Sequence, residues 1–169
     1  KMLSLLIDPE FTFSGRSRRP PMDPFNSLIS LGYSIILNEL YGKIEGKGLN
    51  PYFGIMHKDR EKHPTLASDL MEEWRAVLID STALSMLNGH ELLLEDFYSG
   101  SDCPGVFLEQ EGFKKYIKKL EGKFRTDSRY LSYIEYAVSF RRALDFQIAQ
   151  FVKAIETENV DEYMPIEIR

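Results

Sequence analysis

The chain of 169 residues is 43% hydrophobic, 28% charged and 12% aromatic, a composition that can bury the core of one domain and that excludes an intrinsically disordered protein. No apolar run approaches the roughly 20 residues that cross a bilayer, so we expect no membrane partner. The single cysteine, Cys103, excludes an internal disulfide framework and fits a reducing, cytoplasmic location. A formal net charge of −5 argues against a generally basic nucleic-acid surface, so the positions of the basic clusters decide that question.

The N-terminal residues 1–13 contain a short apolar patch followed by Asp8 and Pro9. We interpret them as the end of a helix whose beginning precedes Lys1, because the patch is too short for the hydrophobic region of a signal peptide. Residues 15–23, GRSRRPPMD, hold two prolines and a glycine and are expected to form an extended basic loop.

Two segments of the N-terminal half have apolar residues at helical spacing. Residues 24–44 are predicted to be helical, with Asp23 as the N-cap and Pro24 at the first helical position. Residues 65–87 are predicted to form a second helix with an apolar face and a neighbouring polar stripe. The glycines and prolines of the segment between them, GLNPYFGIMHKDREKHP, indicate a structured connection that holds His57 in a fixed place.

The pattern changes in the C-terminal half. The sequences LLLEDFY, SGSDCPG and VFL predict a small β-hairpin, and residues 111–123 predict a basic amphipathic helix. A last long helix is predicted from Ser128 to Glu156. The expected fold class is mainly α, with a small β-hairpin insertion, and residues 1–169 are expected to form a single helical domain.

His57, Asp69 and Glu72 are the best candidates for a metal site. An imidazole in a loop and carboxylates on the following helix can converge on a divalent cation, because hard cations prefer oxygen ligands and accept an imidazole. The pattern by itself favours an ordinary hydrogen-bonded histidine and a solvated helix face, so spacing alone does not establish the metal site.

A resemblance to a known family is carried by three stretches of sequence: GRSRRPPMDPFNSLISLGYSIILNEL, then GLNPYFGIMHKDREKHPTLASDLMEEWR, then EDFY with GVFLEQEGFKKYI. In this order they closely resemble consecutive segments of the CRISPR-associated integrases of the Cas-one family. The resemblance covers nearly the whole chain. It implies a metal-dependent DNA integrase or endonuclease that joins DNA 3′ hydroxyl ends to a CRISPR repeat by transesterification.

The resemblance also implies a ligand set for Mg²⁺ or Mn²⁺, consisting of a glutamate, a histidine and an acidic residue. His57 matches the histidine and Glu72 matches the acidic ligand, so we assign these two as catalytic, with Asp69 one turn earlier as the less favoured ligand. The family's glutamate, the start of its first catalytic helix and its β-rich N-terminal domain are expected to precede Lys1. The 169 residues alone are therefore expected to fold but to bind metal poorly.

Basic residues near these positions are candidates for DNA contacts. Arg60 and Arg75 each follow a presumed ligand by three residues, and the resemblance implies that they meet a phosphate. It implies the same for the arginine-rich loop that holds Arg16, Arg18 and Arg19. Surface salt bridges and a solvated loop are the alternatives.

Asn26 and Tyr33 lie seven residues apart on one face of the first predicted helix and match family positions near the catalytic cleft. A buried tyrosine beside a hydrogen-bonded asparagine would explain them equally well. The partners that the resemblance implies are double-stranded DNA and, for full-length proteins, a second copy of the chain and a Cas-two dimer. Two alternatives stay open: a transposon-encoded integrase with the same domain, and a noncatalytic assembly module with a vestigial metal site.

Overall fold

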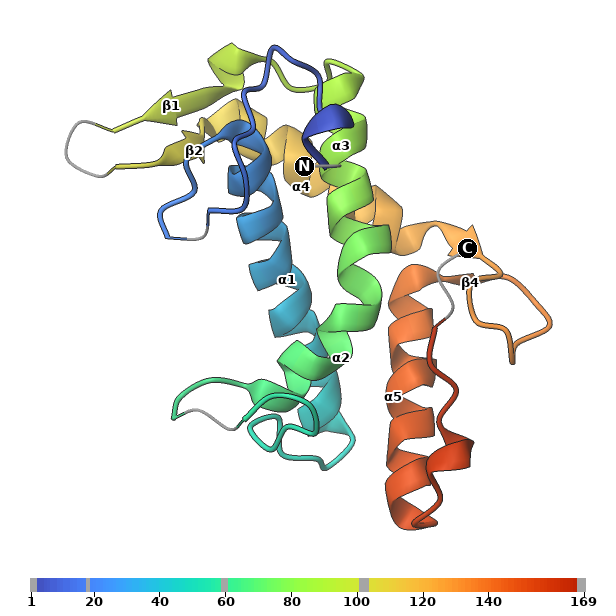
Figure 1. The fold of residues 1–169 in the computed structure, drawn as a ribbon. Coiled ribbons are helices and arrows are strands. Elements are labelled where there is room, and N and C mark those ends of the chain that lie inside the picture. The colour runs from blue at the N-terminus through green and yellow to red at the C-terminus, as the bar shows by residue number, and fades with distance from the viewer. Residues whose placement is uncertain (1–2, 18, 59–60, 101–103, 167–169) are drawn as a thin grey trace. The chain divides into compact units, whose positions relative to one another are not determined.

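The computed structural model describes residues 3–17, 19–58, 61–100 and 104–166. Within them the α-helices are α1 (Pro24–Gly46), α2 (Thr65–Arg75), α3 (Ser81–Asn88), α4 (Gln110–Arg125) and α5 (Phe140–Glu156). A π-helical segment, η2 (Ala76–Asp80), joins α2 to α3, and the 3-10 turns are η1 (Leu3–Leu5), η3 (Leu94–Asp96) and η4 (Val160–Glu162). The mainly helical character is evident in Figure 1 and confirms the predicted fold class.

The strands are short and pair locally. Strand β1 (Phe97–Ser99) pairs antiparallel with β2 (Val106–Leu108), which confirms the predicted hairpin. Strand β3 (Asp127–Ser128) pairs antiparallel with β4 (Val138–Ser139). No described helix is both long enough and apolar enough to cross a membrane.

The chain divides into two compact units, one made of Lys1–Ser34 with Val77–Gly122 and the other of Ile35–Ala76 with Lys123–Arg169. Helix α1 passes from the first unit into the second after Ser34. That residues 1–169 act as a single domain stays a prediction.

The first unit contains the N-terminal turns of α1 together with α3, α4 and the hairpin. Asp23 Oδ1 accepts a hydrogen bond from the Asn26 amide at 2.8 Å, so the predicted N-cap is confirmed. Tyr116 on α4 is buried and donates its hydroxyl to the Leu28 carbonyl at 2.9 Å. Gly32 permits this packing, because a Cβ there would lie 2.4 Å from both Ile79 and the Tyr116 hydroxyl.

The second unit contains the remainder of α1 together with α2, α5 and the C-terminal segment. Trp74 is almost fully buried, with ring centroids 6.1 Å from Tyr130 and 6.4 Å from Phe140. Burial of one such large side chain stabilises the fold by roughly 1.5–3 kcal/mol, so this aromatic cluster fixes α2 against α5 and the segment before it.

One predicted element is wrong in extent. The last helix begins at Phe140 rather than Ser128, because Ser128 pairs with Val138 and Ser139 caps α5 by accepting the Arg142 amide at 3.3 Å. Leu131, whose spacing suggested a helix, lies in the connection between β3 and β4, and its side chain is buried.

The N-terminal segment holds a 3-10 turn, Leu3–Leu5, and that it ends a helix that begins before Lys1 stays a prediction. The residues after this turn bond to α3: Asn88 donates to the Leu6 carbonyl at 2.7 Å and accepts the Asp8 amide at 2.9 Å. Pro9 cannot donate a helical hydrogen bond, and Phe11 is buried as an anchor.

Candidate functional site

The loop before α2 lies directly against the first turn of that helix. The Leu66 amide donates to the Pro51 carbonyl at 2.9 Å. A Cβ on Gly54 would lie 2.4 Å from Thr65 Cγ2 and 3.0 Å from Asp69 Oδ2, so only glycine allows this close approach. The loop is therefore fixed to the helix that carries the candidate carboxylates.

Asp69 is the centre of this arrangement. Its carboxylate is buried and accepts three backbone amides, from Ile55 at 2.7 Å, Met56 at 2.9 Å and His57 at 3.2 Å. The His57 ring adds a fourth contact, with Nδ1 2.5 Å from Asp69 Oδ1. Burial alone would raise the pKa of Asp69, but the hydrogen bonds from Met56, the His57 ring, Ile55 and the His57 amide lower it overall.

The position of His57 follows from these contacts. An ionised Asp69 can only accept hydrogen bonds, so Nδ1 of His57 donates to it, and in the neutral form of the ring the lone pair then lies on Nε2. The His57 side chain is about half exposed, at 55%. The structure thus brings His57 and Asp69 together, as the sequence predicts, with Asp69 acting as the anchor of the loop.

Glu72 lies on α2 one helical turn after Asp69, where residues three apart are neighbours. Its Oε2 is 2.7 Å from Nη2 of Arg75, and both side chains are partly exposed. The structure therefore brings Arg75 to the candidate ligand Glu72.

In the described residues no three histidine, cysteine, aspartate or glutamate side chains are grouped so that they could hold a metal ion. The individual side chains can still be compared as ligands for the divalent cation that the family resemblance implies. Asp69 has both oxygens engaged by hydrogen bonds, whereas a neutral His57 ring offers Nε2 as a ligand and Glu72 keeps a second carboxylate oxygen beside its contact to Arg75. One nitrogen and one carboxylate fit a cation that takes its other ligands from elsewhere.

A second cluster of predicted residues lies in the first unit. Arg16 donates to the Asn26 Oδ1 atom at 2.8 Å, and its guanidinium lies 5.5 Å from the centroid of the Tyr33 ring. Tyr33 in turn donates to Asp80 Oδ1 at 2.5 Å. The structure thus groups Arg16, Asn26 and Tyr33, and it adds Asp80, which the sequence pattern did not single out.

Asn26 in this cluster is fully buried and serves the fold. Its side-chain nitrogen, Nδ2, donates to Asp23 Oδ2 at 2.6 Å and to the Gly15 carbonyl at 2.8 Å. These contacts hold the basic loop against the start of α1. Of the other predicted arginines, Arg19 is exposed, and Arg18 and Arg60 lie outside the described residues.

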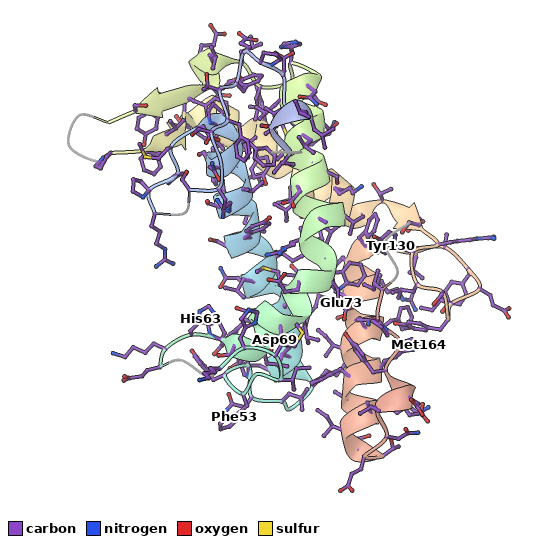
Figure 2. The ribbon with its side chains drawn as sticks, viewed as in Figure 1. Phe53, His63, Asp69, Glu73, Tyr130 and Met164 are labelled. Carbon is purple, nitrogen blue, oxygen red and sulfur yellow. The ribbon has the colours of Figure 1, made fainter. Side chains whose placement is uncertain are left out.

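Glu73, the residue after Glu72, belongs to the same helix but was not predicted as a functional residue. Its carboxylate accepts from the Tyr163 hydroxyl at 2.5 Å and from Gln147 Nε2 at 3.1 Å (Figure 2 shows Glu73 between α2 and the segment that holds Met164). Burial raises the pKa of Glu73, although the hydrogen bonds from Tyr163 and Ile166 oppose the change. The only signal in the sequence was a second glutamate beside Glu72, because its partners lie far along the chain.

The fold is shared with several solved structures. A Cas6-RT-Cas1–Cas2 complex matches with a TM-score of 0.85 and 28% identity, over 98% of this chain and 18% of that chain. A casposase bound to integration product matches with a TM-score of 0.84 over 99% of this chain and 49% of that chain, and its 20% identity makes this a likeness of fold. The chain is thus a helical domain of the class found in Cas1 proteins and casposases.

Sequence comparison narrows this class to one family. The family described as CRISPR associated protein Cas1 matches residues 1–122. A CRISPR-associated endonuclease Cas1 of Mycobacterium tuberculosis is 37% identical over 166 residues, which are 98% of this chain and 49% of the relative. The chain belongs to the Cas1 family, which confirms the resemblance, and it spans about half the length of this curated relative.

Proposed function

We propose that the protein is a divalent-metal-dependent DNA integrase or endonuclease that joins DNA 3′ hydroxyl ends to a CRISPR repeat during spacer acquisition. The observation that carries the proposal is the anchored histidine: Asp69 fixes the Nδ1 side of the His57 ring, one helical turn before Glu72. Membership of the Cas1 family supplies the class of substrate.

Asp69 is proposed to position His57 rather than to act as a ligand itself. Its buried oxygens already accept three amides and the imidazole, and a carboxylate behind a metal-binding histidine fixes the tautomer and orientation of the ring. That role needs an ionised Asp69, which its lowered pKa provides at neutral pH. The assignment of Asp69 as a direct ligand stays a less favoured prediction.

His57 Nε2 and the second oxygen of Glu72 are the groups that would hold Mg²⁺ or Mn²⁺. When bound, such a cation lowers the pKa of an attacking hydroxyl and neutralises charge on the reacting phosphate. Mg²⁺ typically keeps several waters and takes only one or two protein carboxylates beside substrate phosphates. An imidazole among oxygen ligands favours Mn²⁺ more than an all-oxygen set would.

Arg75 is proposed to move from Glu72 to a DNA phosphate when substrate binds. A guanidinium binds carboxylate and phosphate with the same planar donor fork, so the contact to Glu72 at 2.7 Å prepares its orientation. Arg16 and Arg19 are proposed to contact the DNA backbone, together with Arg18 and Arg60, for which the proposal rests on sequence alone.

The proposed strand transfer leaves the number of phosphodiester bonds and the number of protons unchanged. The oxygen of a DNA 3′ hydroxyl forms one phosphodiester bond while the bond to the leaving 3′ oxygen breaks, and the proton lost by the first oxygen equals the one gained by the second. No nucleotide triphosphate is therefore required. Replacement of the attacking hydroxyl by water gives the endonuclease reaction at the same phosphate.

The proposed partners are double-stranded DNA, a second copy of the chain and a Cas2 dimer, in the cytoplasm. The Cas6-RT-Cas1–Cas2 complex supports the Cas2 partner, since its Cas1 part has this fold. The fold likeness to a casposase favours one alternative, a transposon-encoded integrase that joins DNA ends without a CRISPR repeat.

A strand-transfer assay tests the proposal. Labelled DNA with a free 3′ hydroxyl is incubated with Mn²⁺ and two plasmids, one with a CRISPR repeat and one without, and a 3′-dideoxy DNA serves as control. Joining that needs the 3′ hydroxyl and prefers the repeat supports the proposal. Equal joining to both plasmids favours the transposon alternative, and no joining by a protein as long as the curated relatives overturns the proposal.

A further inference from the structure

The carboxyl group of Glu73 on α2 lies at the centre of a hydrogen-bond network in the second unit. The Tyr163 hydroxyl donates to its Oε1 at 2.5 Å, and its Oε2 accepts from Gln147 Nε2 at 3.1 Å and from the Ile166 amide at 3.4 Å. Gln147 is buried, and its Oε1 accepts in turn from the Tyr133 hydroxyl at 3.0 Å. We call Glu73, Gln147, Tyr133 and Tyr163 the Glu73 clamp.

The Glu73 clamp fixes its own geometry. The oxygen of Gln147 accepts from Tyr133, and its nitrogen donates both to Glu73 and to the Met164 carbonyl at 3.0 Å, so the orientation of this amide is determined. A buried network whose members are satisfied in this way is rigid. It joins α2 to α5, to the connection between β3 and β4, and to the segment 160–166, all within the second unit.

The segment 160–166 is attached to α2 by polar contacts. Val160 and Met164 are 83% and 43% exposed, so these two apolar side chains contribute little to the core. The ring of Tyr163 packs edge-on against Phe151 of α5, with ring centroids 5.9 Å apart, while its hydroxyl bonds to Glu73. The link between this segment and α2 therefore depends on the hydrogen bonds to Glu73.

The clamp acts on the last turn of α2. Trp74, the next residue, is almost fully buried and holds the helix by apolar contact, which is non-directional and tolerates a small rotation. Hydrogen bonds weaken steeply when donor and acceptor turn away from each other. The segment that follows Arg75, Ala76–Asp80, is π-helical, so the regular α-helical hydrogen bonds end with α2. The Glu73 clamp thus supplies directional contacts that fix the rotation of this turn.

Glu72 shares that turn and directly precedes Glu73. The two residues are about 100° apart around the helix, so a rotation that displaces one displaces the other. A rotation of about 10° moves a carboxylate that lies about 6 Å from the helix axis by roughly 1 Å. A misplacement of about 1 Å can slow a reaction about 100-fold.

We infer that Glu73 is a positioning residue, which acts with Tyr163 and Gln147 to hold the candidate ligand Glu72 where it can bind the divalent cation together with His57. The inference rests on the proposed function, which makes Glu72 a ligand. It gives the C-terminal segment a part in metal binding, although this segment supplies no ligand itself. The clamp therefore links metal affinity to residues 74 and 90 positions away from Glu73.

The test measures Mn²⁺ binding by a protein as long as the curated relatives, from the electron paramagnetic resonance signal of the free ion. Glu73→Gln keeps the size of the side chain but leaves one oxygen for three donors, and Tyr163→Phe removes one of those donors. Each should weaken Mn²⁺ binding about tenfold, the lower end of the loss when the support of a metal ligand is removed. Joining of a 3′ hydroxyl end should slow at low Mn²⁺ concentration and recover at high concentration.

Two comparisons separate positioning from a purely structural role. The double variant of Glu73→Gln and Tyr163→Phe should bind Mn²⁺ no more weakly than the weaker single variant, because both changes open the same network. Ile44→Val is the matched control, since it removes one carbon from the buried core of the same unit and should lower stability without changing Mn²⁺ affinity.

Lower stability with wild-type Mn²⁺ affinity in Glu73→Gln and Tyr163→Phe would overturn the inference, and so would losses of affinity that add in the double variant. His57→Ala and Glu72→Ala are measured in parallel. If these two weaken Mn²⁺ binding and the clamp variants do not, the inference fails and the proposed metal site stands. Mn²⁺ binding that neither His57→Ala nor Glu72→Ala weakens removes the proposed metal site, and the inference with it.

Discussion

The Nδ1 atom of His57 lies 2.5 Å from Oδ1 of Asp69, and the same carboxylate accepts the backbone amide of His57 at 3.2 Å. One buried group therefore fixes both the main chain and the ring of this residue. Loss of His57 removes only an exposed ring, whereas loss of Asp69 leaves several donors without a partner. Substitutions of the two residues should consequently differ in stability as well as in activity.

In a protein as long as the curated relatives, His57→Ala and Glu72→Ala should each abolish strand transfer and leave the melting temperature nearly unchanged. Both side chains are partly exposed and contribute little to the core. The measurements are joining of a labelled 3′ hydroxyl end and a thermal melt, with His63→Ala as the control for loss of a neighbouring exposed imidazole. Wild-type joining rates in either variant would refute the assignment of these residues to the site.

Asp69→Ala should lower both stability and activity. The Ile55, Met56 and His57 amides would lose their acceptor, and a buried donor without a partner costs about 1–3 kcal/mol. The freed His57 ring should reduce joining about 10–100-fold, as loss of such an orienting carboxylate commonly does. Urea unfolding and joining rates measure the two effects. Full stability with lost activity would instead support Asp69 as a direct ligand.

The first long helix was predictable from the sequence because local and tertiary signals agree there. The Asp23 cap, Pro24 at the first position and the apolar spacing all point to a helix, and α1 begins at Pro24. The segment from Ser128 to Ser139 was not predictable in this way. Leu131 is buried in the connection between β3 and β4, and Val138 is buried in β4 itself, so their spacing resembled a helical period by coincidence.

The candidate site shows the same division between local and distant contacts. The nearness of His57 to α2 could be predicted, since loop and helix are adjacent in the chain. The sequence could not show that Asp69 accepts the loop amides, because main-chain donors leave no trace in residue identity. Glu73 was missed for a related reason: its partners Gln147 and Tyr163 lie 74 and 90 residues away.

The ion pair of Asp96 and Lys115 should make stability depend on pH. Burial would raise the pKa of Asp96, but the Leu93 amide and Lys115, whose Nζ lies 2.9 Å from both oxygens, lower it overall. The unfolded chain therefore takes up the proton first as pH falls. The stabilisation is complete above the ordinary carboxyl pKa of about 4 and is lost as pH falls through the lower folded value.

Urea unfolding of the wild type and of Asp96→Asn between pH 7 and pH 3 tests this dependence. The difference in free energy of unfolding should be largest at neutral pH and should shrink towards the acid end. Glu111→Gln is the matched control, because Glu111 forms an exposed ion pair with Lys114 and should change stability little at any pH. A constant difference between Asp96→Asn and wild type would contradict the prediction.

Tyr163→Phe should loosen the C-terminal segment from α2. The hydroxyl of Tyr163 donates to the half-buried Glu73 on α2, and a hydrogen bond to a charged group contributes about 1.5–3 kcal/mol. Amide hydrogen exchange at Met164 and Ile166, which donate to Gln150 and Glu73, should accelerate. Tyr136→Phe, at an exposed tyrosine, is the control. Unchanged exchange at both amides would show that packing alone holds the segment.

Arg75→Ala should weaken DNA binding and lower the slope of log affinity against log salt concentration by about one, because each phosphate contact releases roughly one counterion. Arg60→Ala should do the same on the basis of its sequence position. Arg75→Lys keeps the charge and should restore the slope but not the full affinity, since an ammonium lacks the planar fork that contacts Glu72. Arg142→Ala, on α5, controls for the loss of any arginine.

Unchanged slopes for Arg60→Ala and Arg75→Ala would mean that both residues are solvated surface residues that do not contact DNA. An unchanged slope with slower joining in Arg75→Ala would mean that Arg75 acts by holding Glu72.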